Sequence, residues 1–129
     1  MNRFALEEFS IIKGNVHFYK LKVDETCPID DFWDQIEKEG NLVKQLDNAI
    51  AIMERHAQGH ALSPKKFKKI STSKDPVNEY VVKTKDLRIY LFRDKDGAIV
   101  VSGGKKSTQR SDINRFKNLV KEYCNSKKI

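Results

Sequence analysis

The side chains best suited to chemistry in this sequence are the cations and hydroxyls of one short stretch, GGKKSTQR (103–110). It follows a predicted β-hairpin and precedes a predicted helix, and the start of a helix favours anions because its first N–H groups are free to donate. The stretch lacks the spacing of a P-loop, so we do not expect it to bind a nucleotide. The alternative interpretation is a solvated turn in front of a helix.

A second candidate site lies on the hairpin itself. Arg88 and Tyr90 fall on the same face of a predicted strand, because strand side chains alternate. A planar cation beside an aromatic ring suits phosphate binding and base stacking. A solvated arginine and an amphipathic tyrosine at a sheet edge would produce the same pattern, so both interpretations stay open.

A third basic segment precedes the hairpin and has four lysines around an aromatic residue: Lys65, Lys66, Phe67, Lys68 and Lys69. Basic groups with interspersed aromatics are typical of nucleic-acid interfaces. The charge distribution agrees with this pattern. Residues 1–59 carry 7 Lys or Arg and 11 Asp or Glu, a net charge of −4, whereas residues 60–129 carry 18 and 7, a net charge of +11. We therefore expect the second half of the chain to contact an anionic partner.

The remaining side chains exclude several kinds of enzyme. The basic half shows no Ser/His/Asp set, no carboxylate pair on paired strands and no cluster of metal ligands, and Cys27 and Cys124 are too isolated for a CxxC site or a disulfide framework. We expect two reduced thiols, no metal and no cofactor. One chemistry is compatible with Lys, Arg, Tyr and hydroxyl groups: metal-free RNA cleavage, in which the ribose 2′-hydroxyl attacks and the protein positions the phosphate and neutralises its charge.

Hydrophobic periodicity and turn residues predict one α+β domain over residues 1–129. We expect an N-terminal strand and a helical hairpin packed on an antiparallel β-meander of three to four strands, followed by a C-terminal helix. The predicted strands are 15–23, 77–84, 87–94 and 98–103, and the predicted helices are 28–39, 42–57 and 111–124. A basic segment at 65–71 alternates imperfectly between polar and apolar residues.

The boundaries of these elements follow from single residues. Gly40 is expected to end the first helix, Asp96-Gly97 to form the hairpin turn and Ser111 to cap the last helix. Residues 1–14 are expected to be an N-terminal extension and 125–129 a frayed basic tail. No apolar run approaches membrane-spanning length and the start shows no signal-peptide pattern, so we expect a cytoplasmic protein without a membrane partner.

The run EYVVKTKDLRIYLFRDKDGAIVVSGGKKSTQRSDINRFKNLVKEY (79–123), preceded by LSPKKFKKI (62–70), resembles the RelE/ParE superfamily of toxins from bacterial toxin–antitoxin pairs. Within that superfamily it is most similar to the HigB-like, phage-derived branch. The order of elements is similar over residues 15–124, and the motif-level match covers 79–117. The resemblance implies a small basic α+β domain. Many such proteins cut messenger RNA on the ribosome, whereas ParE-type members inhibit DNA gyrase.

Four residues match the motifs of the superfamily. Glu79 corresponds to the acidic residue of its Y-E-L-R strand, Arg88 to the arginine before its aromatic Y-F strand, and Lys105 and Lys106 to its K-K-[ST] segment. The resemblance implies that these cations hold the phosphate to be cleaved.

The chain also departs from the family pattern at two places. Val81 and Val82 stand where an arginine is usual, and Ser102-Gly103-Gly104 replaces the frequent H-G-F segment. These departures are compatible with a related fold that has weak or altered nuclease activity.

The leading expectation is therefore the toxin component of a toxin–antitoxin pair, a metal-free endoribonuclease. Its expected partners are messenger RNA, the ribosome and a small antitoxin protein with a helix-turn-helix domain. The catalytic candidates are Arg88, Lys105, Lys106 and Lys68, and the RNA-binding candidates are Lys65, Lys66, Lys69, Tyr90 and Arg110. Two alternatives remain open: a ParE-like inhibitor of DNA gyrase, and an RNA-binding module of the same fold without catalysis.

Overall fold

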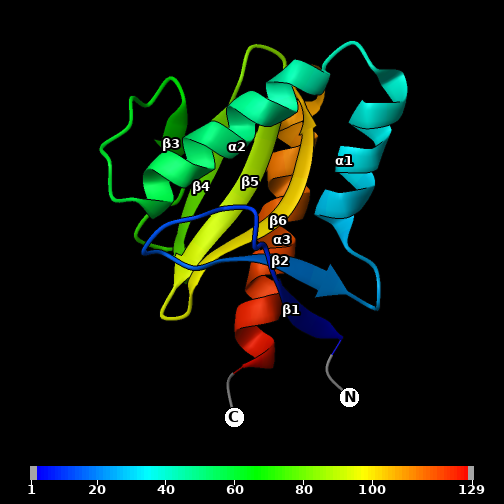
Figure 1. Cartoon of the computed structure of the whole chain (residues 1–129). Coiled ribbons are helices and arrows are strands. Elements are labelled where there is room, and N and C mark those ends of the chain that lie inside the picture. Colours follow the sequence, from blue (N-terminus) through cyan, green and yellow to red (C-terminus); the bar gives the residue numbers. More distant parts are fainter. Residues whose placement is uncertain (1–2, 128–129) are drawn as a thin grey trace.

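The structure is a computed structural model that describes residues 3–127, and its centre is a six-stranded sheet with helices on both faces (Figure 1). The strand order is β1-β2-β6-β5-β4-β3. Neighbouring strands are antiparallel except β2 and β6, which are parallel. The elements are β1 (Phe4–Glu8), β2 (Phe18–Val23), α1 (Pro28–Glu39), α2 (Val43–Ala57), β3 (Phe67–Lys69), β4 (Asn78–Lys83), β5 (Leu87–Asp94), β6 (Gly97–Lys105), the 3₁₀ turn Lys106–Thr108 and α3 (Gln109–Ser126).

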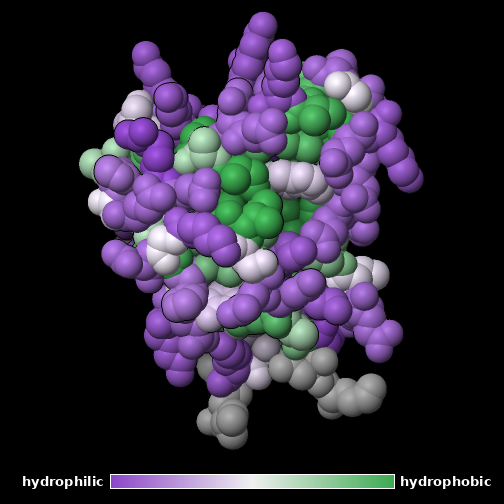
Figure 2. All heavy atoms as spheres, viewed as in Figure 1, coloured by the Kyte–Doolittle hydropathy of each residue, from purple (hydrophilic) through white to green (hydrophobic). Residues whose placement is uncertain are grey.

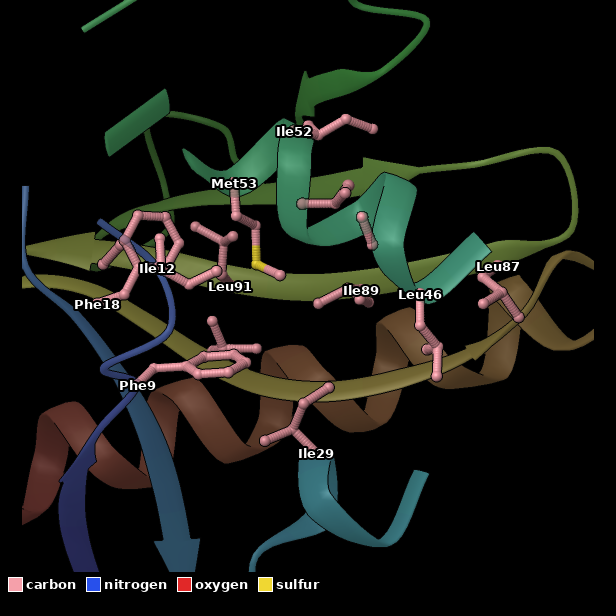
Figure 3. Close-up of a cluster of buried hydrophobic side chains, with 14 of the residues drawn as sticks. Phe9, Ile12, Phe18, Ile29, Leu46, Ile52, Met53, Leu87, Ile89 and Leu91 are labelled. Atoms are coloured by element: carbon pink, nitrogen blue, oxygen red, sulfur yellow. The ribbon is translucent and has the colours of Figure 1, made fainter. Parts of the chain in front are cut away.

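The central strand β5 divides the core into two layers because its side chains alternate. Ile89 and Leu91 pack with α1 and α2, as Figure 3 shows for α2, and Tyr90 and Phe92 pack under α3 on the opposite face. All four side chains are fully buried. The alternation predicted for 87–94 is confirmed, and so is the α+β class.

The two N-terminal helices have the boundaries that their residues predict. Pro28 begins α1, Asp30 and Asp31 lie in its first turn, and Gly40 ends it in the left-handed conformation while donating its N–H to Ile36. α1 packs on β2 and β6, whereas α2 packs on β4 and β5. The two helices are consecutive as expected, but each one covers its own part of the sheet, so they do not pack mainly as a hairpin.

Four parts of the sequence-based fold need correction. The expected N-terminal extension contains β1, and the sheet is mixed because β2 joins it in parallel with β6. Ser111 does not cap the last helix, since α3 starts at Gln109 and Ser111 lies inside it. The Ser111 hydroxyl donates to the carbonyl of Thr108, in the 3₁₀ turn before the helix. α3 also extends to Ser126, into the predicted frayed tail, whose residues 128–129 lie outside the described residues.

The glycine pair of GGKKSTQR lies inside β6 and not in a loop. A Cβ atom on Gly103 would lie 2.4 Å from the Phe32 ring of α1, and one on Gly104 would lie 2.0 Å from the Asp112 carboxylate of α3. The two glycines therefore allow helices to approach β6 closely from both sides. The sequence indicated an anion-binding stretch or a solvated turn here, whereas the two glycines belong to a strand and serve close packing.

Hydrophilic side chains cover most of the face seen in Figure 2, and hydrophobic ones show mainly where the sheet lies between α1 and α2. In the part of the chain from residue 3 to residue 127, no helix combines the length and the apolar composition needed to span a membrane.

We expect Gly103→Ala to lower the free energy of unfolding by about 1–3 kcal/mol, because the added methyl group would collide with the buried Phe32 ring. Chemical denaturation measures this change. The neighbouring Ser102→Ala adds no atom and should stay within about 0.5 kcal/mol of the parent protein. Phe32→Leu combined with Gly103→Ala should recover part of the loss; an unchanged midpoint for Gly103→Ala alone would contradict the packing.

A candidate nucleic-acid interface at the end of the sheet

A groove with a volume of about 880 Å³ lies between α2 and the end of β4. It is lined by residues of three segments, 48–55, 61–66 and 83–85. Five of the lining residues are cations, namely Arg55, Lys65, Lys66, Lys83 and Lys85, and none of the described residues that line it has a carboxylate. We call these five residues and the hollow between them the basic groove. Such a surface attracts polyanions.

Hydrogen bonds of the main chain and of Gln45 hold the walls of the basic groove. The Lys83 N–H donates to the Lys66 carbonyl at 2.8 Å, which joins the segment before β3 to the end of β4. In the turn after β4, the Gln45 Oε1 atom of α2 accepts hydrogen bonds from the Thr84 hydroxyl at 2.6 Å and the Asp86 N–H at 2.8 Å. The groove is thus formed by segments whose positions are fixed relative to α2.

Lys83 connects the groove to two further cations. It lies opposite Arg88 in the β4–β5 register, and Lys68 lies opposite Val81, which has its side chain on the same face as that of Lys83. Partial burial lowers the pKa of the Lys83 ammonium, and the charges of Lys68 and Arg88 lower it further. A lysine with a lowered pKa has a larger neutral fraction, which can accept a proton.

Arg88 is buried and is bonded to the protein itself. Its Nε atom donates to the Gln109 side chain at 2.7 Å, and its Nη1 atom donates to the carbonyls of Thr84 at 2.7 Å and Leu87 at 2.9 Å. With 8 % of its surface exposed, it is neither a solvated arginine nor an open phosphate clamp. Its role in the described conformation is to hold the β4–β5 turn against the start of α3.

Tyr90 cannot stack on a base in this conformation, because its ring is fully buried against Phe116 at a centroid distance of 5.6 Å. Its hydroxyl has no hydrogen-bond partner among the described residues. Burial, and secondarily the Asp112 carboxylate, raises the pKa of this phenol to about 12. The expected RNA-binding role of Tyr90 is therefore corrected to a role in the core.

The cations at the end of β6 neighbour Arg88 in the sheet, since Lys105 is opposite Leu87 and Gly104 is opposite Arg88, but their side chains have other surroundings. Lys105 forms an ion pair with Glu39 at 2.7 Å. Lys105 and Lys106 line a separate cleft of about 590 Å³, together with residues of the α1–α2 connection and Asp86. Arg110 is exposed beside hydroxyl groups at the start of α3. The structure thus does not bring these predicted residues together around one phosphate with Arg88.

The lysines of the third basic segment divide between two places. Lys65 and Lys66 belong to the basic groove, as the sequence suggested for an RNA-binding surface. Lys68 and Lys69 are exposed on β3, which is the edge strand of the sheet, and Lys68 is close enough to Lys83 to affect its pKa. RNA binding and catalysis by these residues stay predictions.

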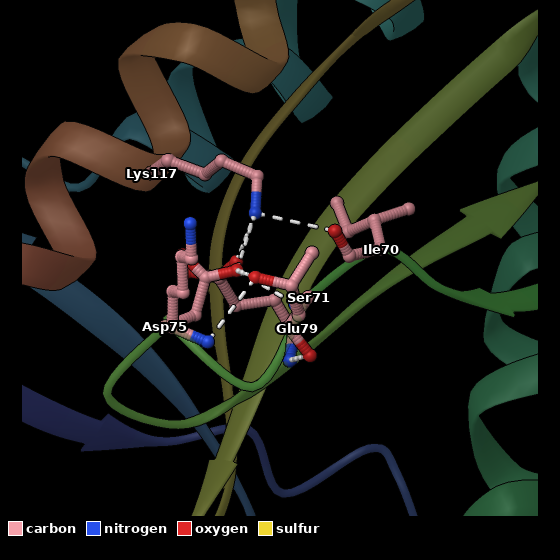
Figure 4. Close-up of polar contacts among 7 residues, drawn as sticks. Ile70, Ser71, Asp75, Glu79 and Lys117 are labelled. Atoms are coloured by element: carbon pink, nitrogen blue, oxygen red, sulfur yellow. Dashed lines mark hydrogen bonds and ion pairs between the residues drawn. The ribbon is translucent and has the colours of Figure 1, made fainter.

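Glu79, which matches the family's acidic residue, is 1 % exposed and lies under α3. Its Oε1 atom accepts a short hydrogen bond of 2.5 Å from the Lys117 ammonium, which also bonds Asp75 and the Ile70 carbonyl, each at 3.2 Å (Figure 4). Its Oε2 atom has no partner among the described residues. Burial raises the pKa of Glu79 in spite of Lys117. This carboxylate therefore anchors the start of β4 to α3.

One group of potential metal ligands occurs among the described residues: Glu7, Cys27 and Asp30. The Lys20 ammonium lies 2.9 Å from Asp30 and 3.9 Å from Glu7, so a cation already faces the two carboxylates. Burial raises the pKa of the Cys27 thiol, which disfavours the thiolate that a metal would need. This group is poorly suited to a metal ion, and both cysteines, Cys27 and Cys124, are partly buried.

Sequence reasoning missed three residues of the basic groove: Arg55, Lys83 and Lys85. Arg55 belongs to the acidic half of the chain and reaches the groove only through the packing of α2. Lys83 and Lys85 follow the strand pattern of 77–84, and two cations separated by one residue at a strand end were a usable signal. No protein-family model, curated protein or solved structure matches this chain.

We expect Lys117→Met to destabilise the protein by about 3 kcal/mol at pH 7, because it leaves the Glu79 carboxylate buried and unpaired. The effect should shrink toward pH 4. Burial already raises the pKa of Glu79, so the folded state prefers the protonated acid, and its stability falls as pH rises above about 4.3. Removing Lys117 makes that fall steeper.

Urea unfolding at pH 4 and pH 7 measures this dependence. Lys44→Met, in the first turn of α2, changes an exposed lysine of another helix and serves as the control. A pH-independent loss in Lys117→Met would show that packing of the lysine stem, and not the charge on Glu79, is responsible.

Proposed function

We propose that this protein binds RNA, with the phosphate backbone held in the basic groove. The observation that carries the proposal is the groove's composition: five cations and, among its described lining residues, no carboxylate. Elsewhere on the molecule several lysines have acidic partners, as in Lys105–Glu39 and Lys20–Asp30. The ammonium and guanidinium groups of the groove are thus left to neutralise charges that come from a partner.

A phosphate backbone is common to RNA and DNA, and the resemblance to ribosome-dependent ribonucleases favours RNA. The groove offers no helix or ribbon that would enter a DNA major groove, since α2 contributes to a concave wall. The shape and charge of the groove suit a strand whose backbone follows the wall and whose bases remain accessible.

We expect RNA affinity to fall steeply with salt, and the slope of log K against log salt to decrease by about 0.7 for each phosphate contact removed from a single strand. Lys65→Gln, Lys66→Gln and Lys85→Gln, alone and combined, test this by fluorescence anisotropy at several salt concentrations. Lys95→Gln is the matched control, because Lys95 is an exposed lysine in the turn at the opposite end of β5. A slope unchanged in the triple variant would contradict binding in the basic groove.

The position of Lys83 opposite Arg88 and near Lys68, together with its lowered pKa, supports RNA cleavage as a second candidate function. In this mechanism neutral Lys83 takes the proton of a ribose 2′-hydroxyl, and the 2′-oxygen forms a bond to phosphorus. The bond from phosphorus to the 5′-oxygen breaks, and that oxygen receives a proton from a neighbouring ammonium such as that of Lys68. The products are a 2′,3′-cyclic phosphate and a free 5′-hydroxyl. The ribonuclease role that the resemblance implies depends on a cleavage step of this kind.

Lys83→Arg separates cleavage from binding, because arginine keeps the positive charge but does not lose its proton near neutral pH. We expect the cleavage rate to fall by about 100-fold or more while RNA affinity is retained. Gel analysis of end-labelled RNA, with product ends identified by mass spectrometry, measures the rate. RNA with a 2′-deoxy sugar at the cleaved position is the control substrate. Cleavage by Lys83→Arg at the parental rate would remove Lys83 as the base.

A further inference from the structure

We infer that an aromatic cluster beside the basic groove, formed by His56, Phe67 and Tyr80, is a stacking site for a nucleobase of the bound RNA. This inference rests on the proposed RNA binding and adds a base-binding site to it. The three side chains come from α2, β3 and β4, and each is only partly buried.

The rings of the cluster are already arranged face to face. The His56 and Phe67 centroids are 4.4 Å apart with an interplanar angle of 20°, and those of Phe67 and Tyr80 are 4.9 Å apart with an angle of 28°. Bases stack on aromatic side chains in the same parallel manner, and the contact tolerates any base because each has a π-face. A nucleobase that stacks on the exposed part of these rings would continue the same parallel arrangement.

The cluster adjoins the cations that would hold the phosphates. His56 follows Arg55 in α2, and Phe67 follows Lys66, so two of the three rings are one residue from a cation of the basic groove. The N–H groups of Lys66 and Phe67 both donate to the Ser63 carbonyl at 2.9 Å, which fixes these two neighbours together. A strand whose phosphate lies in the groove would therefore have a base within reach of the rings.

Burial and a hydrogen bond from Arg93 keep the His56 ring neutral. The Arg93 Nη1 atom lies 3.0 Å from the His56 Nε2 atom, and Arg93 donates there because a guanidinium has no acceptor. Burial lowers the pKa of His56, and the charge of Arg93 lowers it further. His56 therefore presents an uncharged ring at neutral pH, and its orientation is held by the hydrogen bond.

Two other aromatic pairs of the described chain are less suited to this role. The Tyr90–Phe116 pair is fully buried. Phe9 and Trp33 line a hollow whose carboxylates, those of Glu7, Glu8, Asp30 and Asp34, outnumber its single lysine and would repel a phosphate. Base stacking thus fits the rings beside the basic groove better than these pairs.

A short RNA that contains 2-aminopurine tests the inference, because stacking on an aromatic ring quenches the fluorescence of this base. We expect quenching when the parent protein binds. Phe67→Leu keeps every charge of the groove, so it should reduce the quenching and weaken binding by about tenfold without changing the salt slope. Tyr19→Leu is the matched control: Tyr19 stacks on His17 with centroids 6.4 Å apart, on β2, away from the groove.

A measurement on the unaltered protein covers the case in which Phe67→Leu fails to fold. RNA with 5-iodouridine crosslinks to nearby aromatic side chains under light, and we expect mass spectrometry to find the crosslinks at His56, Phe67 or Tyr80. Binding with the predicted salt slope, but with no quenching and with crosslinks elsewhere, would overturn the stacking site and leave the proposed function intact. Absence of RNA binding would overturn both.

Discussion

Burial of β5 on both faces is the constraint on which the rest of the structure depends. Six consecutive residues, Leu87 to Phe92, are buried, and Ile89 and Leu91 face α2 while Tyr90 and Phe92 face α3. Fully burying one large apolar side chain contributes roughly 1.5–3 kcal/mol, so both helical layers are needed to cover this strand. With both faces of the central strand covered, open polar surface remains at the ends and edges of the sheet. The basic groove lies at the end of β4, and the aromatic cluster lies beside it near the edge strand β3.

Local patterns were sufficient for most elements of this fold. The alternation at 87–94 gave the bounds of β5, and Pro28 with Gly40 gave those of α1, because these signals depend on neighbouring residues alone. β1 and the parallel pairing of β2 with β6 could not be predicted in the same way. Both depend on contacts between segments far apart in the chain, and Phe4–Glu8 is short enough to read as an extension. The helix α3 was expected, but its position on the face opposite α1 and α2 was not.

The candidate site was predictable in composition but not in geometry. An excess of positive charge in the second half correctly indicated where a cationic surface would lie, and Lys65 and Lys66 belong to it. The sequence predicted an exposed Arg88, because an arginine in a strand is usually exposed. In the structure Arg88 is buried, and three hydrogen bonds replace its contacts with water. The glycine pair was misplaced because glycine serves loops and close packing equally well, and Phe32 and Asp112, which decide between them, are remote in sequence.

The helix α3 also affects the groove, although it contributes none of the described lining residues. Through Lys117 it holds the Ile70 carbonyl and Asp75, which lie in the loop between β3 and β4, and Glu79 at the start of β4. Through Gln109 it holds Arg88, which in turn bonds the carbonyls at the β4–β5 turn. Both ends of β4 are thus attached to the same helix from the opposite face of the sheet. Four of the five groove cations and two of the three rings belong to the segment from Lys65 to Lys85, which contains β3 and β4. The relative positions of the phosphate-binding and base-stacking groups therefore depend on the position of α3.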